Sequence, residues 1–427
     1  MAGYVDSYYA RTVLEPGERL PLDAVVDAEV CVIGGGLAGL ASALDLAERG
    51  RSVVLLERHR VGWGASGRNG GFASPGYPDG MPSLVDRVGL PAAQEMYRLS
   101  RGAQDQMRAW IARYAIDCGP LEEGALRCAM AGSRENLQKY CDDMARHFDV
   151  EFTHWTAAEI GAALATKAYA DGFYNPTTFR LHPLNLARGY ARAAEGLGVR
   201  IFEQSPALAL DLKGPRRTVT TPRGQVRADS VVLAGGGYIG LLHWPVSMAT
   251  VPVATFVMVT EPLGDRLRQT IAVPYAISDI KTATNYYRPL ADSRLMWGGR
   301  VLAWEPSADR LARLLRHDMV AFYPGLADVR IEVAWGGMMP YLRHKLPLIG
   351  KIADGVWVAT GFGGLGLVLT TLAGQLIGAG LAEGDDRWRR FAAFGLPFAG
   401  GPLGKIPAQA IYWRHQGEAW LGRHKRA

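Results

Sequence analysis

Three glycines and one carboxylate near the N-terminus have the spacing of a dinucleotide-binding turn. Gly34, Gly36 and Gly39 form the pattern GxGxxG directly after the apolar run 30–33, and Glu57 follows eighteen residues after the third glycine. Such glycines permit a tight turn, a close approach of the backbone to a pyrophosphate, and close packing of a helix on a strand. A carboxylate at Glu57 suits a pair of ribose hydroxyls and disfavours the 2'-phosphate of NADP. These residues predict a dinucleotide site.

The elements around this turn have the order strand, helix, strand. Residues 30–33 and 53–56 are short apolar runs, whereas 37–49 has helical spacing and stops at Gly50. The two strands are expected to be parallel. The amino end of the helix then presents free N–H groups and the positive end of its dipole to the phosphates. The predicted contacts in this unit also include Leu37, Ala38 and Arg58.

A second glycine-rich segment favours FAD over NAD. Residues 61–71 read VGWGASGRNGG, where an NAD-binding domain would proceed to its next helix. Five glycines allow the backbone to lie along an extended cofactor, and polar side chains add donors. The alternative is an ordinary flexible loop. The predicted FAD contacts here are Gly64, Ala65, Ser66, Arg68, Asn69, Gly70 and Gly71.

Residues 355–382 contain no charged side chain and are long enough to span a bilayer. Their eight glycines make a poor continuous helix, so we predict a strand, a glycine loop and a buried helix instead of a membrane span.

The bulk composition fits a soluble globular enzyme of two domains. The 427 residues are 48% hydrophobic and 21% charged, with a net charge of +6 that is scattered along the chain. A scattered charge argues against a nucleic-acid partner. The four cysteines form no CxxC pair, so we expect no metal site and a reducing, cytoplasmic location. No secretory signal is visible at the N-terminus.

The downstream sequence predicts a second, substrate-binding domain. Residues 84–146 appear mostly helical, and 250–299 contain short runs rich in Val, Thr, Tyr and Trp that are separated by Pro, Asp and Gly. The expected fold class is α/β, or α+β overall. It combines a Rossmann-like FAD domain with a mixed, largely antiparallel sheet.

With these motifs, the sequence resembles the D-amino-acid-oxidase-like FAD oxidoreductases. The resemblance covers nearly the whole chain, through SYYA at 7–10, GASGRNGG at 64–71, HPLNLA at 182–187 and NYYR at 285–288. It implies an FAD domain of residues 1–83, 178–247 and 331–385, a substrate domain of 84–177 and 248–330, and a tail of 386–427. It adds Ala207, Ala234 and Gly235 to the predicted cofactor contacts. It also places the glycine loop at the pyrimidine end of the flavin, where backbone N–H groups and the helix dipole would stabilise negative charge on the reduced flavin. The contacts implied there are Gly361, Phe362, Gly363, Gly364, Leu365, Gly366 and Leu367. Because the loop at 62–71 lacks Cys and His, we expect non-covalent FAD.

The resemblance also implies the reaction. A neutral amine would lose hydride from its α-carbon to flavin N5, and water would hydrolyse the imine, with oxygen or another acceptor reoxidising the flavin. A γ-glutamylated linear amine competes as substrate with a cyclic secondary amino acid such as L-pipecolate. Two alternative classes of protein also fit this sequence. One is an NAD-dependent dehydrogenase, and the other is a non-catalytic or membrane-tethered flavin electron-transfer protein.

Substrate contacts are expected among aromatic and cationic residues of the second sheet. The candidates are Tyr287, Trp297, Arg300 and Arg343, and the two arginines match a carboxylate by their bidentate fork. Tyr286 and Tyr341 are further candidates, whereas His182 fits a structural place at a helix start. Sarcosine-oxidase-type relatives carry lysines where this chain has Met296 and Val368, and a His where it has Leu365. Lys281 and Lys345 are possible replacements for the oxygen-site lysine.

Overall fold

The structure is a computed structural model that describes residues 3–14, 17–130, 132–280, 285–302, 304, 306–410 and 412–414. The chain divides into two units, each built from separated segments. Unit 1 comprises 1–121, 181–251 and 338–402, and unit 2 comprises 122–180, 252–337 and 403–427. These boundaries differ from the expected ones at residues 84–121, which lie in unit 1 because helix α4 (Leu90–Arg113) packs against helix α11 (Gly366–Glu383). The expected tail of 386–427 is also divided, with 386–402 in unit 1 and the rest in unit 2.

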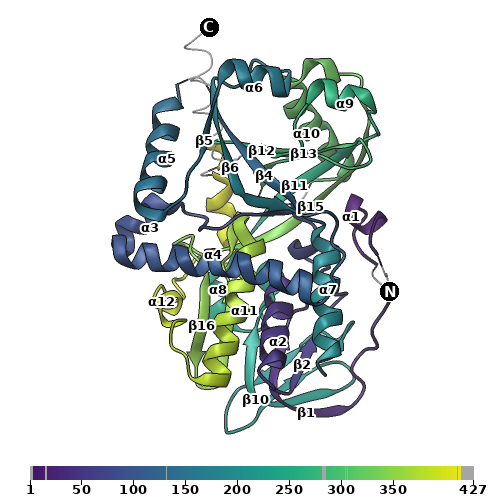
Figure 1. The fold of residues 1–427 in the computed structure, drawn as a ribbon. Helices are drawn as coiled ribbons and strands as arrows, with labels where there is room; N and C mark the ends of the chain where they lie inside the picture. The colour runs from purple at the N-terminus through teal and green to yellow at the C-terminus, as the bar shows by residue number, and fades with distance from the viewer. Residues whose placement is uncertain are drawn as a thin grey trace. The chain divides into compact units, whose positions relative to one another are not determined.

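A mainly parallel sheet forms the centre of unit 1 (Figure 1). Its strand order is β16-β17-β10-β1-β2-β7, and β9 and β8 extend it from β10. The neighbours from β17 to β7 are parallel, whereas β16 and β9 run antiparallel to their partners. The bounds are β1 Val25–Ile33, β2 Val53–Leu56, β7 Arg200–Phe202, β8 Ala209–Asp211, β9 Arg217–Thr220, β10 Gln225–Leu233, β16 Leu348–Ala353 and β17 Val356–Thr360.

The remaining elements of unit 1 are mostly helices that cover this sheet. Helix α2 (Leu37–Glu48) packs between α7 (Pro183–Gly196) and α11. The others are α1 Tyr8–Arg11, η1 Ala65–Gly67, β3 Phe72–Ala73, α3 Met81–Val88, η2 Gly236–Tyr238, α8 Trp244–Ala249, η4 Gly363–Leu365 and α12 Arg389–Ala392, with η5 Gly401–Gly404 at the end of the unit.

The uncharged segment forms a strand, a glycine turn and a buried helix, as predicted from its glycines. Among the described residues, the segment Gly363–Glu383 is long and apolar enough to cross a membrane, and most of it is buried within the protein. Its glycines allow close helix packing, because a Cβ on Gly374 would lie 2.5 Å from the backbone of Ala41 in α2. Core packing therefore accounts for the apolar character of this helix.

Helix α11 also buries a carboxylate of α2. Asp45 accepts a hydrogen bond from Arg49 Nε at 2.6 Å, and a Cβ on Gly378 would collide with the Asp45 carboxylate. Burial raises the pKa of Asp45 from 3.8 to about 6, against the opposing effect of Arg49. Because the folded protein holds this proton more tightly than the unfolded chain, ionisation of Asp45 reduces stability.

We therefore expect the contribution of Asp45 to the free energy of unfolding to fall as the pH rises from about 4 to about 6. The full effect amounts to at most about 3 kcal/mol, from the difference between the two pKa values. Urea unfolding of the wild-type protein and of Asp45→Asn across this range measures it. The variant should show the flatter pH profile, and parallel profiles would contradict the assignment.

Unit 2 contains a mixed, largely antiparallel sheet, which confirms the predicted fold class. Its strand order is β15-β11-β14-β13-β12-β4-β6, and β5 pairs with β6. Strands β4 and β12 run parallel, whereas the β11–β14, β13–β14, β12–β13, β4–β6 and β5–β6 pairs are antiparallel. The strands are β4 Glu122–Ala129, β5 Thr153–Thr156, β6 Asp171–Arg180, β11 Val251–Thr260, β12 Ala276–Asp279, β13 Tyr286–Pro289, β14 Leu295–Leu302 and β15 Ile331–Tyr341. The helices are α5 Arg134–Phe148, α6 Ala157–Leu164, α9 Asp265–Thr270, α10 Ala308–Phe322 and η3 Pro324–Leu326.

Candidate functional site

Four of the predicted cofactor segments follow neighbouring parallel strands of unit 1. The strands end together, because Ile33 of β1 pairs with Leu56 of β2 and Leu233 of β10, and Leu233 pairs with Val358 of β17. The segments that begin at Gly34, Glu57, Ala234 and Gly361 therefore meet at the carboxyl edge of the sheet. Ligands of open α/β sheets bind at this edge.

The first turn brings backbone atoms too close together for any side chain. Gly34 has a φ of 113°, and a Cβ on it would lie 2.6 Å from the carbonyl oxygen of Ala234. A Cβ on Gly39 would lie 2.0 Å from the carbonyl oxygen of Gly34. Gly36 caps helix α2 without a side-chain hydrogen bond. The dipole at the amino end of this helix favours negative charge, as it does where helix starts bind phosphate.

Glu57 is fixed by two backbone amides at the end of β2. Its Oε2 accepts a hydrogen bond from Gly35 N at 2.7 Å, and its Oε1 accepts one from His59 N at 2.7 Å. Burial raises the pKa of Glu57, and these two amides oppose the rise. Each carboxylate oxygen retains a second acceptor site, so the group can still accept hydrogen bonds from ribose hydroxyls.

The loop 61–71 lies directly against the glycine turn. Ser66 Oγ accepts a hydrogen bond from Leu37 N at 2.9 Å, and Gly62 N donates to Gly35 O at 2.8 Å. The Ser66 hydroxyl thus occupies one of the free amides at the start of α2, where a phosphate oxygen would also bind. Loop 61–71 and the turn form one surface, as expected for an extended cofactor.

Other side chains of this loop hold its own shape. Asn69 donates to the carbonyl oxygens of Ala65 and Ser66 at 3.1 and 2.9 Å. Arg68 is buried, donates from Nε to Trp63 O at 2.7 Å, and lies over the Trp63 ring at 4.1 Å. These contacts give both residues a role in shaping the loop, besides any contact with a cofactor. Ala207, by contrast, packs in the apolar core that also contains Ile33 and Leu56.

Sequence reasoning missed a buried carboxylate that ties the N-terminal segment to this loop. Glu203 is fully buried, accepts hydrogen bonds from Val61 N at 2.8 Å and Arg19 N at 3.2 Å, and lies 3.5 Å from the Arg19 guanidinium. Arg60 Nε lies 3.8 Å from the same carboxylate. Glu203 follows the short strand β7, whose end gave no motif, so only the tertiary contacts reveal it.

The loop before helix α11 combines a glycine in the left-handed region with a helix start that has no side-chain cap. Gly363 has a φ of 52°, and a Cβ there would lie 2.8 Å from the Tyr341 ring. The backbone of Gly364 hydrogen-bonds the Tyr341 phenol, whose pKa is raised by burial. Leu365 caps the helix without a side-chain bond, so the first amides of α11 keep the positive end of the dipole available.

The structure places two of the predicted substrate residues in the core of unit 2. Tyr287 and Trp297 are fully buried and stack with their ring centroids 4.4 Å apart. The Tyr287 hydroxyl bonds those of Tyr169 at 3.2 Å and Tyr323 at 2.8 Å. These contacts explain the aromatic pattern by packing between paired strands. The expectation that these two side chains meet the substrate is therefore not supported by their surroundings.

The two arginines predicted to bind a carboxylate are placed differently from that expectation. Arg300 is the extra residue of a β-bulge, with a φ of 56°, between the pairs formed by Gly299 and Val301. Its guanidinium already holds Asp318 in two bonds of 2.5 and 2.8 Å. Arg343 is exposed. A guanidinium that already binds a carboxylate and a solvent-exposed arginine are both poor anchors for a substrate carboxylate.

The candidates for a missing lysine have ordinary surroundings where they are described. Lys345 is exposed and lies 3.7 Å from Asp79, and Lys281 falls outside the described residues. Met296 and Val368 are buried apolar side chains. His182 caps α7 by accepting a hydrogen bond from Asn185 N, which confirms its structural place.

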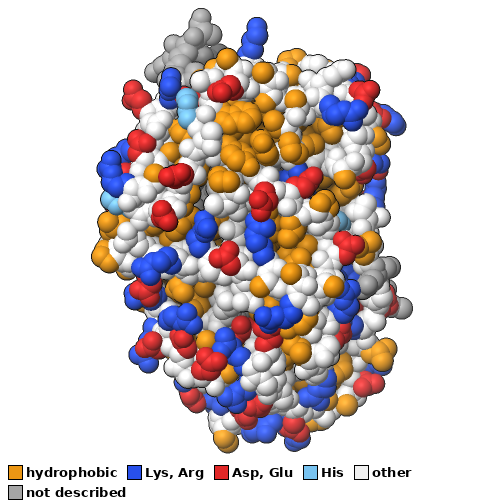
Figure 2. Space-filling model, viewed as in Figure 1, with side chains coloured by type: hydrophobic (Ala, Val, Ile, Leu, Met, Phe, Trp, Pro, Cys, Tyr) orange, Lys and Arg blue, Asp and Glu red, His pale blue; other side chains and the backbone are white. Residues whose placement is uncertain are grey.

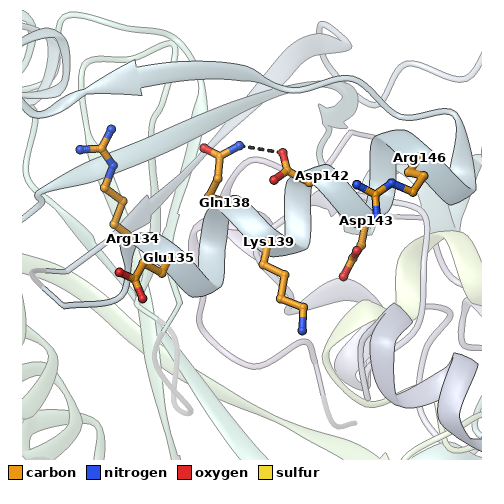
Figure 3. Close-up of a pocket in the computed structure, with 7 residues that line it drawn as sticks. All are labelled: Arg134, Glu135, Gln138, Lys139, Asp142, Asp143 and Arg146. Carbon is orange, nitrogen blue, oxygen red and sulfur yellow. Dashed lines mark hydrogen bonds between the residues drawn. The ribbon is translucent and has the colours of Figure 1, made fainter.

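A pocket on helix α5 contributes no chemistry to this site. Its lining consists of polar side chains from that one helix, and Gln138 donates to Asp142 at 2.8 Å (Figure 3). Three lining residues are acidic and three are basic, so the hollow selects neither sign of charge. On the face drawn in Figure 2, the two signs of charge are likewise interspersed. The lining residues are Arg134, Glu135, Gln138, Lys139, Asp142, Asp143 and Arg146.

The sheet and its carboxyl-edge glycine turns define an α/β enzyme of the dinucleotide-binding class. The first turn provides a helix amino end at which Ser66 holds one amide, Glu57 provides a fixed carboxylate, and the loop 61–71 provides closely approachable backbone, so the residues present fit FAD. The chain belongs to the DAO family of FAD dependent oxidoreductases, whose pattern matches residues 29–379.

Individual relatives cover almost the whole chain. A probable oxidoreductase OrdL of Haemophilus influenzae is 31% identical over 92% of this chain and 92% of its own. A gamma-glutamylputrescine oxidoreductase of Escherichia coli is 32% identical over 96% of this chain and 97% of its own. The crystal structure of glycine oxidase from Bacillus cereus has the same fold, with a TM-score of 0.71 and 19% identity over 86% of this chain and 98% of that one. The protein is thus an FAD-dependent amine or amino-acid oxidoreductase by family.

Proposed function

We propose that this enzyme oxidises the C–N bond of a linear, γ-glutamylated amine. The observation that carries the oxidation is the convergence of four glycine or carboxylate segments at one sheet edge, where FAD fits. The choice of substrate is supported by the 32% identity to the gamma-glutamylputrescine oxidoreductase over nearly the full length. Membership of the family supports catalysis over a purely electron-carrying role.

In this proposal, bound FAD supplies a two-electron acceptor for the hydride that leaves the substrate α-carbon. The nitrogen lone pair forms the C=N bond as the hydride departs, and water then converts the iminium product to an aldehyde and ammonium. The amine must be neutral to react, so a dry site that disfavours the ammonium form assists.

The chain's own residues position the cofactor and stabilise the charge that develops on it. Glu57 holds the ribose, and the amino end of α2 holds the phosphates. The amides at the start of α11 stabilise negative charge that develops on the cofactor, and the Tyr341 phenol fixes Gly364 in that loop. None of these groups needs to transfer a proton. We also propose that FAD is bound without a covalent bond, since loop 61–71 contains neither Cys nor His.

The test begins with the purified yellow protein. Acid precipitation should release the flavin into solution, and flavin in the pellet would overturn non-covalent binding. Anaerobic mixing with γ-glutamylputrescine should bleach the flavin band, whereas L-pipecolate, L-proline and glycine should bleach it far more slowly. Faster bleaching by L-pipecolate would replace the proposed substrate, and a flavin that no amine bleaches would favour the electron-transfer alternative. Admitting air afterwards shows whether oxygen is the acceptor.

A further inference from the structure

Two sequence motifs outside the dinucleotide turn meet in unit 1. SYYA at 7–10 forms the cap and most of helix α1, and HPLNLA at 182–187 begins helix α7, against which α1 lies (Figure 1). Tyr9 is fully buried, and its ring meets the His182 ring edge to face with the centroids 4.8 Å apart. Leu14 N donates to Asn185 Oδ1 at 3.0 Å. The two motifs therefore dock residues 3–14, here called the clasp, on the start of α7.

His182 joins the two motifs in one fixed protonation state. Its Nδ1 accepts a hydrogen bond from Asn185 N at 3.1 Å and therefore carries no proton. Its Nε2 lies 3.1 Å from the hydroxyl oxygen of Thr12, whose hydrogen is donated to Tyr8 O at 2.7 Å. The Nε2–H group must then be the donor to Thr12. One imidazole thus caps α7 with one nitrogen and holds the clasp with the other.

The clasp also bonds the loop 61–71 directly. The Tyr4 hydroxyl donates to Val61 O at 2.8 Å and accepts a hydrogen bond from Arg188 Nη1 of α7 at 3.0 Å. Burial raises the pKa of Tyr4, against the opposing effect of Arg188, so the phenol keeps the proton that it donates. Trp63 Nε1 donates to Gly3 O at 3.2 Å. The clasp and α7 thus hold the first part of the loop together.

The start of α7 holds the rest of the loop. Leu181 N donates to Gly71 O at 3.0 Å. A Cβ on either Gly62 or Gly67 would lie 2.9 Å from Leu184 Cδ1, so the loop packs closely on the helix. The loop in turn bonds the glycine turn through the hydrogen bonds described above. A continuous series of contacts therefore runs from the clasp through α7 and the loop to the turn where FAD fits.

We propose that the clasp holds loop 61–71 on the glycine turn and thereby slows the release of FAD and strengthens its binding. Bound FAD loses contacts when the loop and the turn separate, so every bond that keeps them together slows its departure. Tyr4 and His182 are positioning residues, because they act on the cofactor through the loop. The inference goes beyond the proposed function, since it concerns the cofactor and holds for any amine substrate.

The release rate of FAD tests the clasp. Holoenzyme loaded with radiolabelled FAD is mixed with excess unlabelled FAD, and the loss of protein-bound label gives the rate constant. Tyr4→Phe should accelerate release by about threefold to tenfold, because the hydrogen bond to Val61 O is lost. His182→Asn keeps an acceptor that can cap α7 but loses the donor to Thr12 and the ring contact with Tyr9. It should accelerate release by a similar factor.

Tyr190→Phe is the matched control. This fully buried phenol also lies in α7, but its hydroxyl bonds Thr371 of α11 at 3.3 Å. The substitution should leave the release rate unchanged. Thermal unfolding of each apoprotein checks that the fold is retained. Wild-type release rates in folded Tyr4→Phe and His182→Asn, or an equal acceleration in Tyr190→Phe, would overturn the inference.

Hydrogen exchange supplies a readout that a merely structural contact would not move. If the clasp strengthens FAD binding, linkage requires that FAD also stabilises the docked clasp. The amides of residues 8–14 should therefore exchange at least about threefold more slowly in holoenzyme than in apoprotein, whereas those of β9 should exchange equally in both. Equal exchange of the clasp in the two forms would contradict the proposal.

Acid precipitation separates this inference from the proposed mode of FAD binding. Flavin that acid releases, combined with unchanged release rates in the clasp variants, would overturn the clasp alone. Flavin that stays in the pellet would overturn non-covalent binding and the clasp together. Neither outcome depends on which amine bleaches the flavin.

Discussion

Gly39→Ala should lower the amount of FAD that copurifies with the protein more than about tenfold, because overpacking a rigid backbone contact costs roughly 1–3 kcal/mol or more. The new methyl group would lie 2.0 Å from the carbonyl oxygen of Gly34. Neither atom belongs to a flexible side chain, so helix α2 must move away from the turn that it positions. The ratio of flavin absorbance to protein absorbance after gel filtration measures the effect.

Gly102→Ala is the matched control for this substitution. Gly102 lies in helix α4, and a Cβ there would meet nothing within 4 Å. Alanine should stabilise this helix by about 0.5–1 kcal/mol and leave FAD content unchanged. Far-ultraviolet circular dichroism shows whether Gly39→Ala is still folded. A folded Gly39→Ala with a full complement of FAD would contradict the role of the close contact.

Glu57→Ala should raise the Kd of the apoprotein for FAD by about a hundredfold, since hydrogen bonds to a charged group contribute roughly 1.5–3 kcal/mol each. The substitution removes the acceptor for the ribose and also leaves the amides of Gly35 and His59 without their carboxylate. Glu57→Gln keeps one acceptor oxygen, so its Kd for FAD should rise by only about tenfold. Quenching of flavin fluorescence during reconstitution measures each Kd.

Glu29 offers a control with similar local chemistry at a different place. It lies in the same strand as Ile33, accepts a hydrogen bond from Ser52 N at 2.7 Å and pairs with Arg51, but it precedes the glycine turn by several residues. Glu29→Ala should therefore leave the Kd for FAD unchanged. Equal losses in Glu29→Ala and Glu57→Ala would show that general destabilisation, not ribose binding, explains the result.

Sequence reasoning anticipated the parts of the fold that depend on local backbone geometry. The GxGxxG turn, Glu57 and the loop at 61–71 are close in sequence, and their glycines report positions where no side chain fits. The resemblance extended this interpretation to Gly361–Leu367, whereas the strand pattern at 250–299 had already predicted the largely antiparallel second sheet that the structure contains. The convergence of these segments at one edge follows from the parallel register of four strands.

The same reasoning was less successful for the predicted substrate residues. Aromatic strand residues such as Tyr287 and Trp297 have the same types whether they line a site or fill a core, and here they stack in the interior. An arginine in the sequence likewise does not reveal its partner. Arg300 is held by Asp318, eighteen residues away along the chain.

The sequence by itself therefore determined the backbone of the glycine turn on which the predicted dinucleotide site rests, because a few glycines and one acid must occur at fixed local spacings for the backbone to approach a pyrophosphate. Only the tertiary structure decided which charged groups are buried and which are already paired. Glu203 and Arg180 belong to this second kind, since their partners come from distant segments. The energy of a buried charge depends on such neighbours and on access to water, neither of which is encoded in local spacing.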